Sequence, residues 1–125
     1  MKSLILVMAG GAAGSALRYL LGRALPVSNS GWPWGTFAAN VIGGFAIGML
    51  ATWMLRAGSS AEPIRLFLGV GLLGGFTTFS AYSLELVQMV QRGNGFLAIM
   101  YAMASLVLAL LAVATGMITE KMVFA

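Results

Sequence analysis

The sequence predicts an all-α membrane protein with four transmembrane helices. Of its 125 residues, 60% are hydrophobic and only 8% are charged, whereas soluble domains carry roughly 25% charged residues. Four apolar segments lie at about residues 4–21, 36–55, 64–90 and 96–118. Each is near the ~20 residues that a helix needs to cross a bilayer. No connection between them is long enough to separate domains, so residues 1–125 are expected to form a single transmembrane domain.

The first segment follows Lys2, which also resembles the start of a signal peptide. Three more apolar segments follow, and Arg18 near its far end fits a retained helix better. The connection that comes next is rich in Pro, Ser and Gly and holds Trp32 and Trp34. Tryptophan is enriched where a helix meets the membrane surface, so these rings are expected to anchor the start of the second segment.

The second connection, from Arg56 to Pro63, is short and polar, and proline is well suited to open the third helix. That third segment contains Gly71, Gly74 and Gly75 followed by adjacent threonines. These residues weaken helix propensity. A break inside a bilayer is tolerated only where the freed backbone groups meet protein, water or an ion. The third helix is therefore expected to be broken near Gly74–Thr78, and residues 91–95 connect it to the fourth.

The composition excludes most enzyme chemistry. The chain has no Cys, His or Asp, and its only carboxylates are Glu62, Glu85 and Glu120. Clusters of metal-binding side chains and Ser-His-Asp triads cannot be built from this set. The seven basic residues are scattered, which argues against a nucleic-acid surface. We expect neither an enzyme nor a nucleic-acid partner.

The basic residues are divided almost evenly between the two sides of the membrane. With four spans, both termini and the second connection share one side. Four basic residues lie on that side and three on the other: Lys2, Arg56, Arg65 and Lys121 against Arg18, Arg23 and Arg92. Because orientation follows an excess of Lys and Arg on one side, this near-balance predicts dual topology. In the alternative, one extra charge or the lipid fixes a single orientation.

Small residues recur at helical spacing. Three G-x-x-x-G pairs are present: Gly10 with Gly14, Gly44 with Gly48, and Gly71 with Gly75. Such pairs allow the backbones of two helices to approach closely in lipid. They are compatible with tight packing inside one subunit and with a dimer interface. Since four short helices enclose little volume, we expect a symmetric dimer, with the two copies in opposite orientations.

Polar side chains inside apolar spans indicate function by default. Asn40 and Thr36 share one face of the second helix, where the amide either serves a site or bonds a neighbouring helix. Ser105 and Thr115 in the fourth helix could bond their own backbone. Arg18 either attracts anions at a pore mouth or extends to the lipid headgroups. Glu85 either caps an entrance or pairs with a basic residue.

The stretch after the expected break combines aromatic rings with hydroxyl groups. Phe79, Tyr82 and Ser83 share one helix face, and Ser80 lies beside them. The edge of an aromatic ring carries partial positive charge, so it can face a small anion that has lost its water. Carbonyl oxygens at the break could hold a small cation such as Na⁺. In the alternative, both rings are ordinary core aromatics.

Three motifs resemble those of the small bacterial fluoride channels of the Fluc family. They are Gly10–Tyr19, with the sequence GGAAGSALRY; Gly35–Asn40, with GTFAAN; and Gly74–Ser80, with GGFTTFS. Their order, the chain length and the four apolar segments agree with that family. The resemblance implies an antiparallel homodimer in the bacterial inner membrane, with two pores that export fluoride passively.

The resemblance also implies roles for particular residues. Phe79 and the ring at position 82 are similar to the "Phe box" of each pore, and Asn40 to its asparagine. Gly74 and Thr77 are similar to the residues whose carbonyls hold a structural Na⁺. The position of Tyr82 usually carries Phe, so the edge-on role is in question there. Further members of the polar pathway are Thr36, Ser80, Ser83, Tyr101 and Ser105, and Arg18 lies near a vestibule.

Two other functions fit the size of the chain. A small four-span multidrug or cation exporter also adopts dual topology, but it relies on a carboxylate in its first span. No acidic residue lies between Met1 and Ala61, which argues against an exporter. A non-conducting subunit of a larger complex would explain the glycine pairs but not the clustered hydroxyls and rings.

Overall fold

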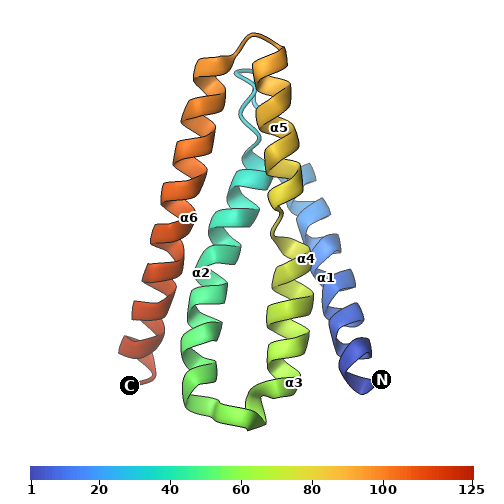
Figure 1. Ribbon diagram of the computed structural model, residues 1–125, viewed down its shortest axis with the longest axis vertical. Coiled ribbons are helices and arrows are strands. Elements are labelled where there is room, and N and C mark those ends of the chain that lie inside the picture. Colours follow the sequence, from blue (N-terminus) through green and yellow to red (C-terminus); the bar gives the residue numbers. More distant parts are fainter.

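The structure is a computed structural model that describes all residues, 1–125, and it is helical throughout (Figure 1). The only strand-like pairing is an isolated bridge between Val27 and Pro33. The prediction of an all-α protein is confirmed. In chain order the elements are α1 (Lys2–Ala24), α2 (Trp34–Ala57), the 3₁₀ turn η1 (Gly58–Ala61), α3 (Glu62–Ile64), the π-helix η2 (Arg65–Leu73), α4 (Gly74–Phe76), α5 (Phe79–Gln91) and α6 (Gly95–Val123).

The helices lie side by side along the long axis of the molecule. In Figure 1, α1 runs upward from the N-terminus, α2 runs down, α3 to α5 run up again, and α6 runs down to the C-terminus. Both termini therefore lie at the same end. Three helical stretches are long and apolar enough to cross a membrane: Lys2–Ala24, Trp34–Gln91 and Gly95–Val123. The second of these contains the turn η1, at which the chain reverses direction.

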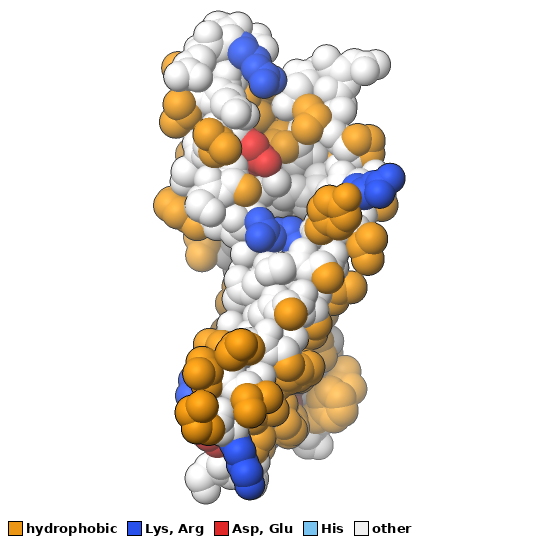
Figure 2. Space-filling model, turned by 90° about the vertical axis from the view of Figure 1, so that its right-hand side faces the viewer, with side chains coloured by type: hydrophobic (Ala, Val, Ile, Leu, Met, Phe, Trp, Pro, Cys, Tyr) orange, Lys and Arg blue, Asp and Glu red, His pale blue; other side chains and the backbone are white.

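Most large apolar side chains lie on the outside of the bundle. Only 19 of the 125 residues are buried, so the hydrophobic effect in water could not hold this fold together. Figure 2 shows hydrophobic side chains over much of one face, with a few basic groups among them. Exposed apolar surface on this scale marks contact with lipid or with another protein. The surface is that of a membrane protein.

Helix α1 packs against η2 and α4 through glycine. A Cβ atom on Gly10 would collide with the carbonyl oxygen of Phe67. A Cβ atom on Gly75 would lie 2.6 Å from the carbonyl oxygen of Gly11. Since the backbones themselves are in contact here, no side chain can be inserted without separating the helices.

Helices α2 and α6 form the second close seam. A Cβ atom on Gly48 would collide with the carbonyl of Val113, and one on Gly116 with that of Phe45. All three G-x-x-x-G pairs thus take part in packing within one chain. Of the two interpretations that the sequence left open, the structure supports intrachain packing for each pair.

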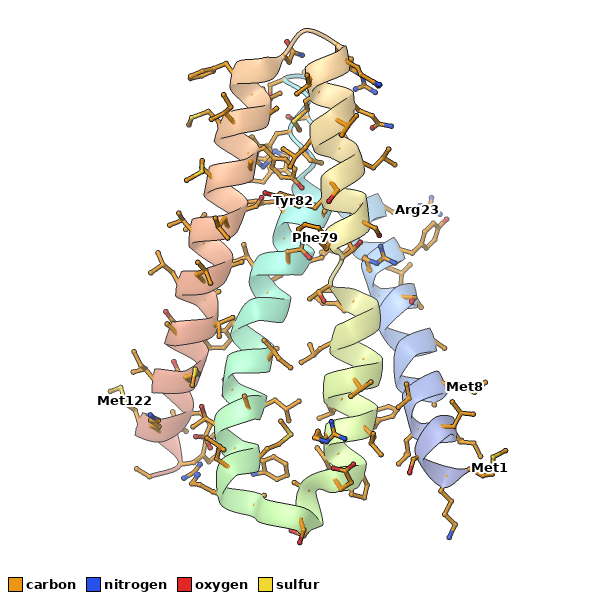
Figure 3. All side chains as sticks on the ribbon, viewed as in Figure 1. Met1, Met8, Arg23, Phe79, Tyr82 and Met122 are labelled. Carbon is orange, nitrogen blue, oxygen red and sulfur yellow. The ribbon has the colours of Figure 1, made fainter.

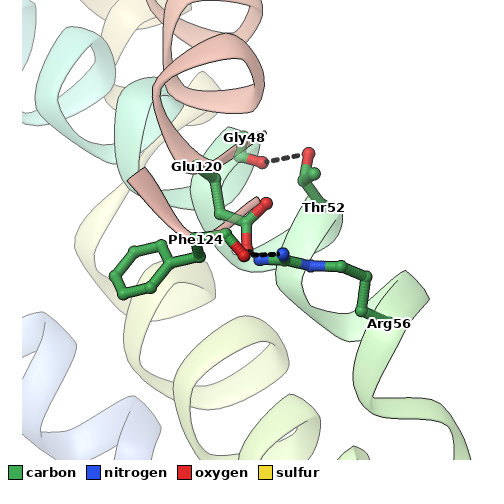
Figure 4. Close-up of polar contacts among 5 residues, drawn as sticks. All are labelled: Gly48, Thr52, Arg56, Glu120 and Phe124. Carbon is green, nitrogen blue, oxygen red and sulfur yellow. Dashed lines mark hydrogen bonds and ion pairs between the residues drawn. The ribbon is translucent and has the colours of Figure 1, made fainter. Parts of the chain in front are cut away.

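An ion pair joins the far ends of the same two helices (Figure 4). The guanidinium group of Arg56, in the last turn of α2, donates to the Glu120 carboxylate and to the backbone carbonyl of Phe124. Glu120 is buried, at 1% exposure, and its second carboxylate oxygen has no partner. Beside it, Thr52 donates to the carbonyl of Gly48 at 3.1 Å. These contacts fix the end of α6 to α2.

The residues between α2 and α3 explain why the chain reverses direction there. Gly58 has a positive φ of 66°, which glycine adopts at no steric cost. Pro63 lies in the first turn of α3, as expected for a helix start. Arg65 donates to both carboxylate oxygens of Glu62 at 2.8 Å, and this hydrogen bonding lowers the pKa of Glu62.

Candidate functional site

The helical path is interrupted between α4 and α5. Thr77 (φ −85°, ψ 156°) and Thr78 (φ −153°, ψ 122°) are extended, and α5 then begins at Phe79. The hydroxyl of Thr78 accepts the N–H of Ala81 at 3.1 Å. Threonine is a favoured N-cap residue because its oxygen replaces a missing helical acceptor. Thr78 thus starts α5 as a new helix.

Asn40 on α2 binds both backbone groups of Thr78. Its Nδ2 donates to the Thr78 carbonyl at 3.0 Å, and its Oδ1 accepts the Thr78 N–H at 2.8 Å. One side-chain amide therefore pairs with the extended backbone as a neighbouring strand would. This use of Asn40 combines the two roles that the sequence left open, since the amide joins two helices and also lies at the site.

The interruption leaves particular carbonyl oxygens without their helical donors. In a continuous helix the N–H of Thr78 would reach Gly74, and that of Ala81 would reach Thr77. Here these N–H groups bond Asn40 and the Thr78 hydroxyl instead. The carbonyl of Gly75, which lies between them in the chain, accepts Nε of Arg18 at 3.2 Å. The carbonyls of Gly74 and Thr77 are thus freed from their usual partners.

An open cleft of about 580 Å³ lies directly beside the interruption. It brings together five residues that the sequence singled out, from α2, the interruption, α5 and α6. The cleft is lined by Asn40, Thr77, Thr78, Phe79, Tyr82, Ser105, Leu106 and Ala109. Figure 3 places the labelled rings of Phe79 and Tyr82 on the side of α5 that faces α2 and α6. Their centroids are 5.8 Å apart, with the rings tilted by 45°.

Some polar groups of this cleft already donate their hydrogens to protein acceptors, and others do not. The Tyr82 hydroxyl donates to the carbonyl of Ala102 at 3.0 Å, so it is committed to α6. Asn40 has a second amide hydrogen in addition to the one given to Thr78. The Ser105 hydroxyl is buried and has no hydrogen-bond partner. Asn40 and Ser105 therefore offer the free donors of the cleft.

Two further predicted residues meet at a carboxylate above the cleft. The hydroxyl of Thr36 donates to Oε1 of Glu85 at 2.6 Å, and that of Tyr101 donates to Oε2 at 2.8 Å. The Tyr101 ring lies 5.4 Å from that of Tyr82. The sequence suggested a capping or pairing role for Glu85 but did not single out these partners. The feature that could have identified Glu85 from the sequence is that it is the only acidic residue inside the third apolar segment.

The remaining predicted residues lie around the cleft rather than in it. Ser83 donates to the carbonyl of Phe79 at 2.9 Å, one helical turn back, and exposed Ser80 lies 3.4 Å from the Thr78 hydroxyl. Arg18 lines a separate hollow of about 410 Å³ with Arg23. Gly74 lines a third, of about 230 Å³, which also includes Asn40 and Thr77.

An apolar helical bundle with a mainly apolar cleft that holds a few polar side chains at a helix break defines a multi-pass membrane protein. Residues 5–117 match the family described as CrcB-like protein, Camphor Resistance (CrcB), and the chain belongs to this family. Its curated relatives carry the name Fluoride-specific ion channel FluC. The resemblance inferred from the three motifs is thereby confirmed.

The similarity extends over the whole chain. The relative from Phenylobacterium zucineum (strain HLK1) is 52% identical over 127 residues, covering 100% of both chains. That from Caulobacter vibrioides (strain NA1000 / CB15N) is 50% identical with the same coverage. That from Sphingopyxis alaskensis is 46% identical over 119 residues, 94% of each chain. The names of these relatives do not favour the exporter alternative.

Proposed function

We propose that this protein is a fluoride-selective channel through which F⁻ leaves the cell passively across the inner membrane. The observation that carries the proposal is the cleft, in which Asn40, Phe79, Tyr82 and Ser105 converge beside a broken membrane helix. The relatives named as fluoride-specific channels support the choice of ion.

The cleft supplies the groups that a dehydrated anion needs. Asn40 offers one amide hydrogen and Ser105 one hydroxyl hydrogen, and the ring edges of Phe79 and Tyr82 offer weak positive charge. No full positive charge lines the cleft. Conduction requires an ion to bind well enough to enter and weakly enough to leave. A few neutral donors meet that requirement better than a lysine or an arginine would.

From the cleft, the pathway continues along α5 and α6. Tyr101 and Thr36 follow with their hydroxyls on Glu85, and Ser80 and Ser83 lie at the start of α5. Arg18 and Arg23 line a basic vestibule at the end of α1, which would raise the local anion concentration.

The channel is proposed to have four spans per subunit and to form an antiparallel homodimer with two pores. Reversal of the chain at η1 divides the stretch Trp34–Gln91 into two spans. The ring of Phe79 is 80% exposed on the single chain. A ring that lines a pore must be shielded from the surrounding lipid, and a second copy of the chain can shield it. The near-balance of basic residues supports insertion in both orientations.

A structural Na⁺ is proposed at the centre of this dimer. The donor set fits, because the carbonyl oxygens of Gly74 and Thr77 have lost their helical N–H partners, and carbonyl oxygens are ligands of hard cations. Gly74 is exposed on the single chain, so its carbonyl is within reach of a partner. Two copies would contribute four such oxygens.

Ion efflux from liposomes that contain the purified protein tests the function. Fluoride should leave rapidly while chloride is retained. Equal rates for the two anions, or no fluoride efflux, would overturn the proposal. The cation is tested separately by replacing Na⁺ with N-methyl-D-glucamine, which should destabilise the dimer or stop conduction. If the dimer is equally stable and conducts equally fast with Na⁺ and with N-methyl-D-glucamine, the proposed cation site at Gly74 and Thr77 is wrong.

A further inference from the structure

Trp32 carries a buried hydrogen-bond donor that the structure leaves unused. Its indole Nε1 is inaccessible to solvent and has no partner. The residue itself is held firmly, because its N–H donates to the Ser28 hydroxyl at 3.1 Å and its carbonyl accepts the Ser28 N–H at 3.0 Å. A buried indole N–H usually finds an acceptor. An unpaired one therefore calls for an explanation.

The Trp32 ring belongs to a row of aromatic rings that begins in the cleft. Phe79 lies 5.8 Å from Tyr82, Tyr82 lies 5.4 Å from Tyr101, and Tyr101 lies 5.2 Å from Trp32. Trp32 also packs against the small buried cluster of Met89, Ala98 and Tyr101. In Figure 1 the segment before α2 lies near the upper ends of α5 and α6. The row thus connects the helix break with one end of the bundle.

The neighbours of the indole offer little to hold a permanent water. Such a water needs two to four polar partners. The rings around Trp32 are those of Trp34, Phe37 and Tyr101. The only hydroxyl among them, on Tyr101, donates its hydrogen to Glu85. A small anion accepts hydrogen bonds and donates none, so it is the kind of ligand that an unpaired N–H can bind.

We propose that the indole N–H of Trp32 is a transient binding site for a small anion at the end of the pathway remote from Phe79. This inference rests on the proposed function and extends it. An indole is a donor only and cannot bind a cation through this group. A hydrogen bond to an ionised acceptor is roughly twice as strong as a neutral one. The site would replace part of the hydration shell before the anion reaches water.

The test compares Trp32→Phe with Trp34→Phe in the liposome efflux assay. Both changes keep an aromatic ring and remove one N–H, but Trp34 is 46% exposed and its indole is not an unpaired buried donor. Loss of a charge-assisted hydrogen bond should slow fluoride efflux through the Trp32 variant about tenfold. The Trp34 variant should conduct at the wild-type rate.

Failure of this inference is distinct from failure of the channel proposal. If the wild type and Trp32→Phe release fluoride equally fast, the indole donor is satisfied by a neighbouring ring and the inference is wrong, while the channel stands. If the wild type releases no fluoride, both are wrong.

A second measurement does not depend on the folding of the Trp32 variant. In protein carrying Trp34→Phe and Trp53→Phe, Trp32 is the only tryptophan. Its fluorescence should shift on addition of fluoride and not of chloride. Emission that is unchanged by fluoride, in protein that conducts it, would also overturn the inference.

Discussion

Replacing Asn40 with leucine should destabilise the fold more than the loss of an ordinary contact between helices. Asn40 holds both backbone groups of Thr78, a residue with 9% exposure. A buried polar group left unpaired costs about 1–3 kcal/mol, so two cost about 2–6 kcal/mol if the break keeps its shape. Hydrogen bonds between membrane helices average about 0.6 kcal/mol, so two ordinary ones would cost about 1 kcal/mol.

The loss in free energy of unfolding can be measured on purified protein in micelles. A denaturing detergent is added, and unfolding is followed by circular dichroism. Asn29→Leu is the matched control, because Asn29 lies exposed in the first connection and makes no side-chain hydrogen bond. The control should leave stability unchanged. A loss below about 1 kcal/mol for Asn40→Leu would place Asn40 among ordinary interhelical contacts and refute the reasoning about the break.

The same variant has a second expected consequence. Without Asn40, no side chain holds the backbone of Thr78 in its extended conformation. The neighbouring carbonyl of Gly74 would then lose the position proposed for a cation ligand. A cation that binds only the folded protein stabilises it, so wild-type protein should be more stable in Na⁺ than in N-methyl-D-glucamine. Asn40→Leu should show no such difference, and an undiminished one would contradict the link.

Three further changes test the cleft, the glycine seam and the ion pair. Phe79→Ile should lower fluoride efflux from liposomes at least about tenfold while the protein elutes from a sizing column at the wild-type volume; unaltered efflux would remove this ring from the proposed pathway. Gly48→Val should cost about 1–3 kcal/mol or prevent folding in the same unfolding assay, because its Cβ meets the carbonyl of Val113; full stability would contradict the close seam. Arg56→Gln should lower the free energy of unfolding by less than is lost when a fully buried ion pair is broken, which is about 3–5 kcal/mol. The Arg56 side chain is 44% exposed, so solvent screens its charge. Adding Glu120→Gln should recover most of that loss, and a further loss would contradict the pairing.

The fold class could be predicted from the sequence because composition dictates it. A chain that is 60% hydrophobic and 8% charged cannot cover a water-facing surface. The interruption is narrower than the break that the sequence predicts near Gly74–Thr78, because Gly74 and Gly75 lie in α4 and only Thr77 and Thr78 are extended. Low helix propensity of the glycines therefore does not explain it, and the hydrogen bonds of Asn40 and of the Thr78 hydroxyl hold the extended backbone. The long helices begin and end within a few residues of the apolar segments.

The partners of particular residues could not be predicted, because they depend on how helices pack. Each glycine pair fitted both a dimer interface and an intrachain seam, and the backbone contacts of Gly10, Gly48 and Gly75 distinguish them. Headgroup contact was one option for Arg18, yet it donates to Gly75 at 3.2 Å. The Tyr82 hydroxyl could have faced an anion, but it donates to Ala102. None of these partners is close in sequence.

The hydrogen-bond partners also indicate how one set of polar residues can both build the fold and pass an ion. Thr36, Tyr82 and Tyr101 give their hydroxyl hydrogens to protein acceptors, so in the proposed channel they would shape the pathway without holding an anion tightly. Free donors remain on Asn40 and Ser105 in the cleft and on the indole of Trp32, and these three residues are far apart in sequence. If every hydroxyl were free, a dehydrated anion would be trapped, and if none were, it could not leave water. In the proposed channel, committing most donors to the fold would set the strength of anion binding, and removing an acceptor such as Glu85 should alter conduction by releasing the hydroxyl hydrogens of Thr36 and Tyr101.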